Sequence, residues 1–218
     1  MRVFVVAGSP TAQQPIGLAP RRGDRVIAAD LGARHARRWG WPVHLLIGDF
    51  DSLEAEELRA VEQAGTPVLR SPAAKDQTDT ELAVAQALTW GADEIVICGA
   101  LGGRTDHLLA NVLLLAHPLL ATPDACLADG AEVVRLLRGT GDTRGLVLAG
   151  AVGDLLSLLP LGGDAEGVST QGLRYPLHDE VLCAGEARGV SNVFSAARAE
   201  VILRRGQLIC IHHKTGER

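Results

Sequence analysis

Residues 1–130 alternate between short apolar runs and longer segments of helical character. The apolar runs are rich in β-branched residues and predict strands. These strands are expected at 3–7, 25–29, 43–47, 67–70, 94–98 and 125–129. Helix formers fill the segments between them, at 31–40, 52–65, 78–91 and 105–117. Such alternation predicts a parallel sheet that helices cover on both faces.

The pattern changes after about residue 138. The segment "LRGTGDTRG" (137–145) is rich in glycine and suggests a linker. Short apolar runs separated by Gly, Pro and Asp then predict antiparallel strands. They are expected at 146–150, 154–161, 167–173, 180–185, 199–206 and 207–213. We therefore expect an α/β catalytic domain over 1–138 and a smaller antiparallel β-sandwich domain over 139–218.

Charge and composition exclude some partners. The net charge is −5 and aromatic residues make up 3% of the chain, which disfavours binding to nucleic acid. No run of apolar residues is long enough to span a membrane, and no secretory leader is recognisable. The four cysteines are widely spaced, as is typical of reduced thiols. We expect a cytoplasmic protein with no membrane or nucleic-acid partner.

Aspartates follow the predicted strands and begin the predicted helices. They are Asp30, Asp49, Asp51, Asp76, Asp79 and Asp106. In a parallel sheet, strand carboxyl ends and helix amino ends share one edge, where ligands bind. Single aspartates could instead cap helices, and Thr78 with Glu81 fits a capping box. Convergence of all six favours a binding site.

Asp49 and Asp51 are one residue apart in "LLIGDFDSLE". In an extended segment their side chains would point the same way, so a cation between them would relieve their repulsion. An all-carboxylate site suits Mg²⁺, which usually completes its shell with water and substrate phosphates. We therefore expect Asp49 and Asp51 to hold Mg²⁺ with a nucleotide.

The segment "GALGGRTDH" provides the means to hold phosphates. The chain has neither a G-x-x-x-x-G-K-[ST] loop nor G-x-G-x-x-G. Gly102 and Gly103 would let the backbone approach a phosphate, and Arg104 offers a forked donor. Lys75 could add a second positive contact, although it could equally be a surface lysine. A flexible turn alone would not require the Arg.

Three segments in this order resemble the catalytic domain of the thiamine pyrophosphokinase family: "GDFDS" (48–52), "KDQTDTELA" (75–83) and "GALGGRTDHLLAN" (99–111). The segments "GVSTQGLRYPL" (167–177) and "GVSN" (189–192) resemble that family's smaller β domain. Two stretches depart from the family pattern. Leu31 lies where the family usually has glycine, and residues 8–24 have no recognisable match.

The resemblance implies transfer of a diphosphate from ATP to the hydroxyethyl group of thiamine, giving thiamine diphosphate and AMP. It also implies a homodimer, with thiamine near the subunit interface. Carried over, Asp51, Asp79 and Asp106 are the catalytic candidates, and Asp79 joins Asp49 and Asp51 as a candidate Mg²⁺ ligand. The ATP-binding candidates are Asp30, Lys75, Asp76, Thr78, Gly102, Gly103, Arg104 and Asn111. The thiamine-binding candidates are Ser169, Tyr175, Ser191 and Asn192.

Tyr175 is the only tyrosine and could stack on a flat heterocycle, or simply pack at the start of a strand. Three other functions fit the acidic edge. A diphosphokinase acting on a hydroxymethyl-pterin would not need the β domain. A Mg²⁺-dependent phosphohydrolase would use Asp49 or Asp51 as nucleophile. A nucleotide or thiamine sensor would bind its ligand without turnover.

Overall fold

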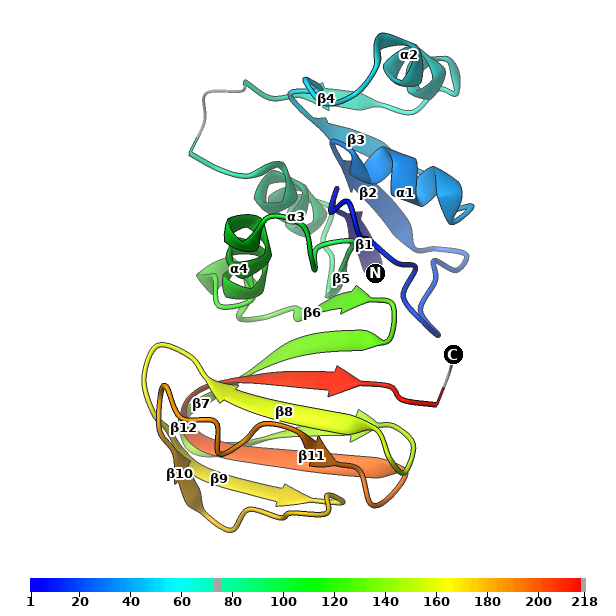
Figure 1. Ribbon diagram of the computed structural model, residues 1–218. Helices are drawn as coiled ribbons and strands as arrows, with labels where there is room; N and C mark the ends of the chain where they lie inside the picture. Colours follow the sequence, from blue (N-terminus) through cyan, green and yellow to red (C-terminus); the bar gives the residue numbers. More distant parts are fainter. Residues whose placement is uncertain (73–75, 217–218) are drawn as a thin grey trace. The chain divides into compact units, whose positions relative to one another are not determined.

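The computed structural model describes residues 1–72 and 76–216 (Figure 1). The chain divides into two compact units, Met1–Gly130 and Ala131–Arg218. The division falls before the expected boundary at 138, because residue 138 lies inside a strand. No helix in the described ranges has the length and apolar character that crossing a membrane requires.

The first unit is built on a parallel sheet, as the sequence predicts. Its strands are β1 Arg2–Val6, β2 Arg25–Ala29, β3 Leu45–Gly48, β4 Val68–Arg70, β5 Glu94–Cys98 and β6 Asp124–Asp129. The strand order is β6-β5-β1-β2-β3-β4, and every pair is parallel. Side chains of β1, β2, β3 and β5 are almost entirely buried, which explains their continuous apolar sequence.

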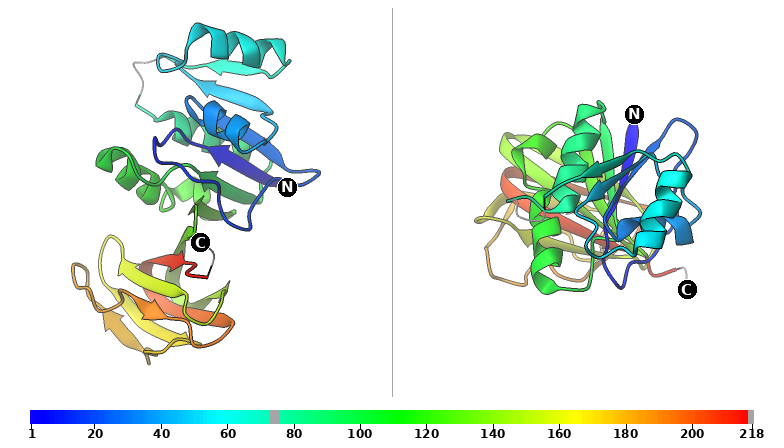
Figure 2. Two further views of the ribbon diagram at one scale, coloured as in Figure 1. Left: turned by 45° about the vertical axis from the view of Figure 1, so that its right-hand side comes forward. Right: turned by 90° about the horizontal axis from the view of Figure 1, so that it is seen from above.

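Helices cover both faces of this sheet (Figure 1; other directions in Figure 2). They are α1 Gly32–Arg38, α2 Ala55–Gln63, α3 Asp79–Thr89 and α4 Thr105–Leu114, and a short 3₁₀ helix follows at Pro118–Leu120. The chain moves one way through β2, β3 and β4 and the other way through β5 and β6. Right-handed crossovers therefore place α1 and α2 on one face and α3 and α4 on the other.

The strand order creates a switch point between β1 and β5. These strands are neighbours, and the connections on either side of them run in opposite directions along the sheet. The loops that follow them separate at the carboxyl edge and leave a crevice there, which is where ligands bind in open α/β sheets.

The second unit consists of antiparallel strands. They are β7 Glu132–Ala149, β8 Leu155–Pro160, β9 Ala165–Gln171, β10 Glu180–Leu182, β11 Asn192–Val193 and β12 Arg198–His213. β12 pairs with β7 along most of its length, with β9 through its first half and with β8 through its second half. The inward side chains, among them Leu156, Val168, Phe194 and Val201, form one hydrophobic core.

Two expectations for this unit are wrong. The glycine-rich segment 137–145 is part of β7 rather than a linker, and the two strands expected at 199–206 and 207–213 are the single strand β12. A Cβ at Gly139 would lie 2.7 Å from the Arg204 backbone, beside a register shift between Leu203 and Arg205. Glycine at this position permits close approach of the two strand backbones where their pairing is irregular. In the sequence, such glycines cannot be distinguished from those of a linker.

Candidate functional site at the carboxyl edge of the parallel sheet

A cavity of about 750 Å³ opens at the switch point. Its walls come from the loops after β1, β2, β3 and β5 and from the first turns of α1, α3 and α4. The predicted residues that line it are Asp30, Asp49, Thr78, Asp79, Gly102, Arg104 and Asn111. The structure therefore brings together candidates that lie up to 81 residues apart in the sequence (111 − 30).

Asp30 directly follows β2 and has a side-chain oxygen that lacks a partner. Its backbone is left-handed, with φ of 46°, and the Oδ1 atom is buried without a hydrogen-bond partner. Burial raises the pKa of the Asp30 carboxyl, and the negative charges of Asp79, Asp49 and Asp51 raise it further. A cation or a hydrogen-bond donor at this point would satisfy the orphan oxygen.

The segment around Asp49 and Asp51 is not extended, so the geometric argument for this pair is wrong. β3 ends at Gly48, and Phe50 has a left-handed backbone with φ of 64°. The Phe50 ring is buried in the core, and the Arg70 guanidinium, on an exposed side chain, lies 5.2 Å from the ring centroid. The Asp51 amide donates to Asp49 Oδ1 at 3.1 Å. Asp49 lines the cavity, whereas Asp51 is exposed and is not among the lining residues.

The expected metal ligands are not assembled in advance. Within residues 1–72 and 76–216, no three His, Cys, Asp or Glu side chains lie close enough together to hold a metal. Asp49 and Asp79 both face the cavity, while Asp51 lies outside its lining. Such a sparse donor set fits Mg²⁺, which often takes only one or two protein carboxylates and completes its shell with water and phosphate.

Helix α3 presents Asp79 at its amino end. Thr78 caps this helix, because its side chain accepts from the Glu81 amide at 3.2 Å. The Glu81 carboxylate accepts from Gln77 Nε2, at 3.2 Å, instead of completing a reciprocal box. Ser71 Oγ donates to Asp79 Oδ1 at 3.2 Å. Asp79 is therefore oriented toward the cavity by the fold.

Two further candidates come from the segment before α3. Asp76 is exposed and does not line it. Lys75 lies outside the described residues.

The loop between β5 and α4 has the conformation that its glycines predict. Gly102 and Gly103 are left-handed, with φ of 90° and 71°. Arg104 precedes α4 and pairs with Asp106 through two contacts, Nε–Oδ1 at 3.1 Å and Nη2–Oδ2 at 2.6 Å. The hydrogen bond from Arg104 lowers the pKa of the Asp106 carboxyl. Asn111 Nδ2 donates to the Ala100 carbonyl at 3.0 Å and so holds the loop against α4.

Arg104 lines the cavity, but Asp106 does not. Their side chains are 73% and 63% exposed, so the guanidinium can exchange this carboxylate for another anion without unburying either group. The predicted phosphate contact is compatible with the geometry. Asp106 is not among the residues that line the cavity, because its carboxylate turns toward Arg104.

Sequence reasoning missed the loop after β1. Gly8, Ser9 and Pro10 line the cavity. The Ser9 amide donates to the Gly99 carbonyl at 3.0 Å, and Ser9 Oγ donates to the Leu101 carbonyl at 2.9 Å. This loop therefore supports the glycine-rich loop from the other side of the switch point. The available signal was positional, since the loop after the first strand of an open α/β sheet reaches the ligand edge.

Other missed residues come from helix starts and neighbouring turns. They are Leu31, Arg34, His35, Ser52, Gln77, Thr80 and His107. Burial lowers the pKa of His35, and the positive charge of Arg38 lowers it further, which favours a neutral imidazole on the wall. Leu31 replaces the glycine of the family pattern and still borders the cavity. Its Cβ faces Gly8, where an added Cβ would lie 2.8 Å away.

In the second unit, Asn192 and Tyr175 form a connected pair. Asn192 Nδ2 donates to the Tyr175 carbonyl at 2.7 Å, and Asn192 Oδ1 accepts from the Tyr175 amide at 3.1 Å and from the Val193 amide at 2.9 Å. Asn192 is buried, whereas the Tyr175 side chain is 57% exposed. The amide of Asn192 is thus engaged with backbone, and Tyr175 is the member of the pair that is free to contact a ligand.

The other two thiamine-binding candidates, Ser191 and Ser169, differ in their positions relative to Tyr175 and Asn192. Ser191 is exposed and left-handed, with φ of 61°, and its amide donates to Ser157 Oγ at 3.0 Å. Ser169 lies on β9, where its Oγ accepts from the Asp179 amide at 2.9 Å. Ser191 is adjacent to Asn192 in the chain, while Ser169 supports the far end of the loop that carries Tyr175.

Comparisons with known proteins agree on one family. Two family models match the chain: "Thiamin pyrophosphokinase, catalytic domain" over residues 21–155, and "Thiamin pyrophosphokinase, vitamin B1 binding domain" over residues 147–208. The thiamine pyrophosphokinase of Bacillus subtilis (strain 168) is 31% identical over 165 residues, which cover 75% of each protein.

Solved structures lead to the same family. A crystal structure of thiamine pyrophosphokinase from Bacillus subtilis superposes with a TM-score of 0.88 and 26% identity, covering 98% of this chain and 99% of that one. A thiamin pyrophosphokinase family protein from Enterococcus faecalis gives a TM-score of 0.85 with 28% identity, covering 99% of this chain and 100% of that one.

Proposed function

This chain belongs to the thiamin pyrophosphokinase family, and we propose that the cavity at the carboxyl edge of its parallel sheet is the ATP site. The protein is a transferase that uses ATP and thiamine. It transfers a diphosphate group to the hydroxyethyl group of thiamine and releases AMP. The comparisons do not favour a pterin substrate, simple hydrolysis or a sensor without turnover.

The observation that supports the ATP site is a group of aspartates, one with an unpartnered buried oxygen, in the same cavity as the glycine-rich loop after β5. Asp30 has an orphan buried oxygen and a raised pKa, with Asp49 and Asp79 facing the same cavity. Gly102 and Arg104 border that cavity. A ligand that carries both a divalent cation and phosphates would satisfy the acids and the loop together.

We propose that Asp49 and Asp79 hold Mg²⁺, with Asp51 reaching it after the exposed turn rearranges. The cation would neutralise charge on the transferred diphosphate and on the leaving AMP. Arg104 would exchange Asp106 for a phosphate oxygen, since both groups of this ion pair are exposed. Thr78, Asn111 and the glycines orient these groups through the helix starts and the loop. Asp76 and Lys75 remain candidates from the segment just before α3.

Proton transfer from the thiamine hydroxyl needs only a weak acceptor once the reactants are aligned. Positioning and charge neutralisation supply most of the rate in phosphoryl transfer. Of the two candidates Asp79 and Asp106, Asp79 lines the cavity and could accept the proton on a carboxylate oxygen that does not bind Mg²⁺, while Asp106 is paired with Arg104. Release of Arg104 to the phosphates would free Asp106 for the same role.

We propose that Tyr175 stacks on a ring of thiamine. Its side chain is exposed, and the Asn192 side chain holds the Tyr175 backbone through two hydrogen bonds. Ser191 is the neighbouring polar contact, and Ser169 holds the loop by accepting from the Asp179 amide. Asn192 thereby acts as a positioning residue rather than a direct ligand.

Several broader expectations remain proposals. We propose that residues 131–218 form a two-layer β-sandwich, in which β12 passes between layers near Gly206, and that the α/β and β domains bind ATP and thiamine respectively. We also propose a cytoplasmic homodimer. All four cysteines are free, as a reducing compartment would keep them. Light scattering would measure the mass of the assembly.

The experiment that tests the function is mass spectrometry of products after incubation with ATP, Mg²⁺ and thiamine. We expect thiamine diphosphate and AMP in equal amounts. Asp49→Asn should lose most of this activity, while Asp76→Asn, whose side chain does not line the cavity, should retain more of it. Absence of thiamine diphosphate, with or without free phosphate, would contradict the assignment.

A further inference from the structure

A second cavity of about 750 Å³ lies in the first unit between α1 and α2. Its apolar wall contains Ala33, Trp41, Val43, Ala60, Val61 and Ala64, and we call it the α1–α2 groove. Among the described residues, it shares only Arg34 with the cavity at the carboxyl edge. Its other lining residues belong to neither the ATP site nor the Tyr175 loop.

The groove exists because α2 packs loosely. Leu58 and Val61 of this helix pack against the cluster that contains Ala28 and Phe50. Yet no residue of α2 is buried, although its polar and apolar residues separate onto opposite faces. Ala60 and Ala64 are too small to fill the space toward α1. Apolar wall surface is thus left in water, at about 25 cal/mol for each Å².

The rim of the groove is basic. Arg34, Arg37 and Arg38 of α1 line it, with Glu57 as the carboxylate among its lining residues. Arg34 forms a two-point pair with Glu57, at 2.7 and 2.6 Å, and Arg38 donates to the Ala12 carbonyl. The Arg37 guanidinium makes no hydrogen bond or ion pair within the described part of the chain.

We propose that the α1–α2 groove is a second binding site, for a small molecule with an apolar body and an anionic group. The volume lies within the usual range for ligand pockets, and an apolar wall with a few convergent polar groups is their usual lining. The apolar body would lie against Ala60 and Val61. A carboxylate, sulfonate or phosphate would pair with Arg37, whose planar donors suit such anions.

The probe pair for this site is 8-anilinonaphthalene-1-sulfonate and N-phenyl-1-naphthylamine, which share a scaffold and differ by the sulfonate. Fluorescence titration of the whole protein should give one sulfonate site, at least about fivefold tighter than the neutral probe. Saturating Mg–ATP should not displace the sulfonate. Displacement by Mg–ATP would place the probe in the other cavity and overturn the proposal.

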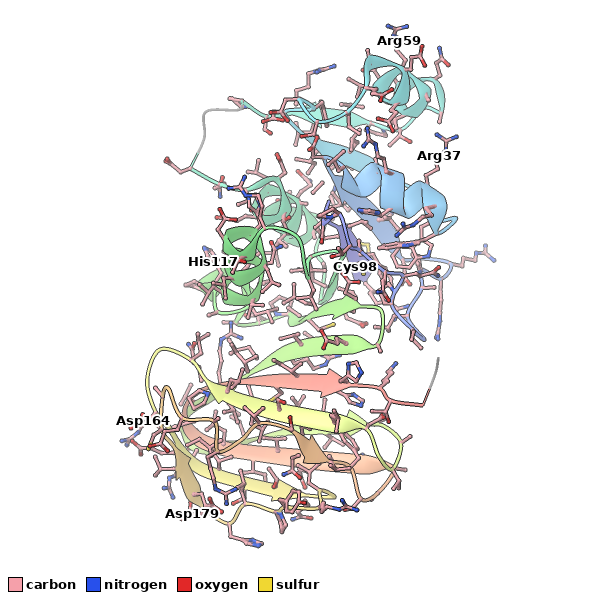
Figure 3. The ribbon with its side chains drawn as sticks, in the orientation of Figure 1. Arg37, Arg59, Cys98, His117, Asp164 and Asp179 are labelled. Atoms are coloured by element: carbon pink, nitrogen blue, oxygen red, sulfur yellow. The ribbon has the colours of Figure 1, made fainter. Side chains whose placement is uncertain are left out.

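Substitutions then locate the probe. Ala60→Phe fills the groove from an exposed position and should weaken sulfonate binding at least about tenfold. Arg37→Ala should weaken it about two- to fivefold and leave the neutral probe unchanged. The matched control is Arg59→Ala, because Arg59 does not line the groove and points away from α1 (Figure 3). Circular dichroism would verify the fold of each variant.

Equal affinity of the two probes, or an unchanged titration of Ala60→Phe, would overturn the proposal. The first result would remove the arginines from recognition, and the second would place the probe on another apolar surface. Because the readout is binding, these outcomes are independent of whether the protein transfers diphosphate to thiamine.

Discussion

Among single residues, Asp30 is expected to support activity while its buried charge lowers the stability of the fold. Burial and neighbouring carboxylates raise its pKa, so at neutral pH its ionised form opposes folding. We expect Asp30→Asn to raise the melting temperature at pH 7.5 by about 2 °C and to abolish most diphosphate transfer. A carboxyl whose pKa is raised in the folded state contributes its full stabilisation only below its unfolded-state pKa. That contribution is lost as pH rises through the folded-state pKa.

The gain from Asp30→Asn should therefore shrink as pH falls through the folded-state pKa of Asp30, and it should be smallest below the ordinary aspartate pKa of about 3.9, where the carboxyl is mostly protonated in both states. Urea unfolding of the two proteins at pH 4.5 and 7.5 measures this difference. A gain that is equal at both pH values would contradict the role of the Asp30 charge.

Asn192 is the second residue with a separable role. Its amide makes three hydrogen bonds to backbone while buried, so Asn192→Ala should lower the free energy of unfolding by about 1–3 kcal/mol. It should also raise the KM for thiamine about tenfold through displacement of Tyr175. Tyr175→Ala is the matched variant, since its exposed ring should change KM for thiamine with little loss of stability. Equal KM effects for ATP and thiamine would argue against both roles.

At the scale of elements, the loops after β1 and β5 support each other. Gly102 has φ of 90°, and a Cβ there would lie 2.1 Å from Thr11 Oγ1. The control is Gly91→Ala. Gly91 has φ of 79° and nothing lies within 4 Å of an added Cβ, so this variant measures the cost of backbone strain alone, about 1–2 kcal/mol. Gly102→Ala should cost more and raise the KM for ATP about tenfold. The double variant with Thr11→Ala should recover part of both losses. No recovery would place the damage outside this contact.

At the scale of the whole molecule, Mg²⁺ and ATP should stabilise the protein together. A ligand at about one hundred times its Kd stabilises the folded state by about 2.7 kcal/mol, or roughly 5–10 °C for a chain of this size. With EDTA, the acidic wall should repel the phosphates and reduce the shift to about 2 °C or less. Thermal melting with ATP, with Mg²⁺ and with both measures this coupling. An unchanged shift of the melting temperature in EDTA would indicate that positively charged side chains of the protein, rather than Mg²⁺, bind the phosphates.

Some features followed from local sequence pattern. The buried strands β1, β2, β3 and β5 are short β-branched runs, and the turns between them carry helix and glycine signals. Period and composition are enough to predict a parallel α/β unit, and parallel strands bring their carboxyl ends to one edge. The meeting of Asp30, Asp49 and Asp79 at a cavity was therefore foreseeable, and the family resemblance added the reaction.

Other features required the tertiary structure. Phe50 adopts a left-handed backbone because burial of its ring in the core offsets the strain, and this turns Asp51 away from the cavity. Position 139 favours glycine because an added Cβ would lie 2.7 Å from the backbone of Arg204, 65 residues later (204 − 139). Periodicity, propensity and strand ends could be predicted from the sequence, since these depend on neighbouring residues. Only the folded chain decided which loops touch and which side chains turn inward, because those outcomes depend on partners distant in sequence.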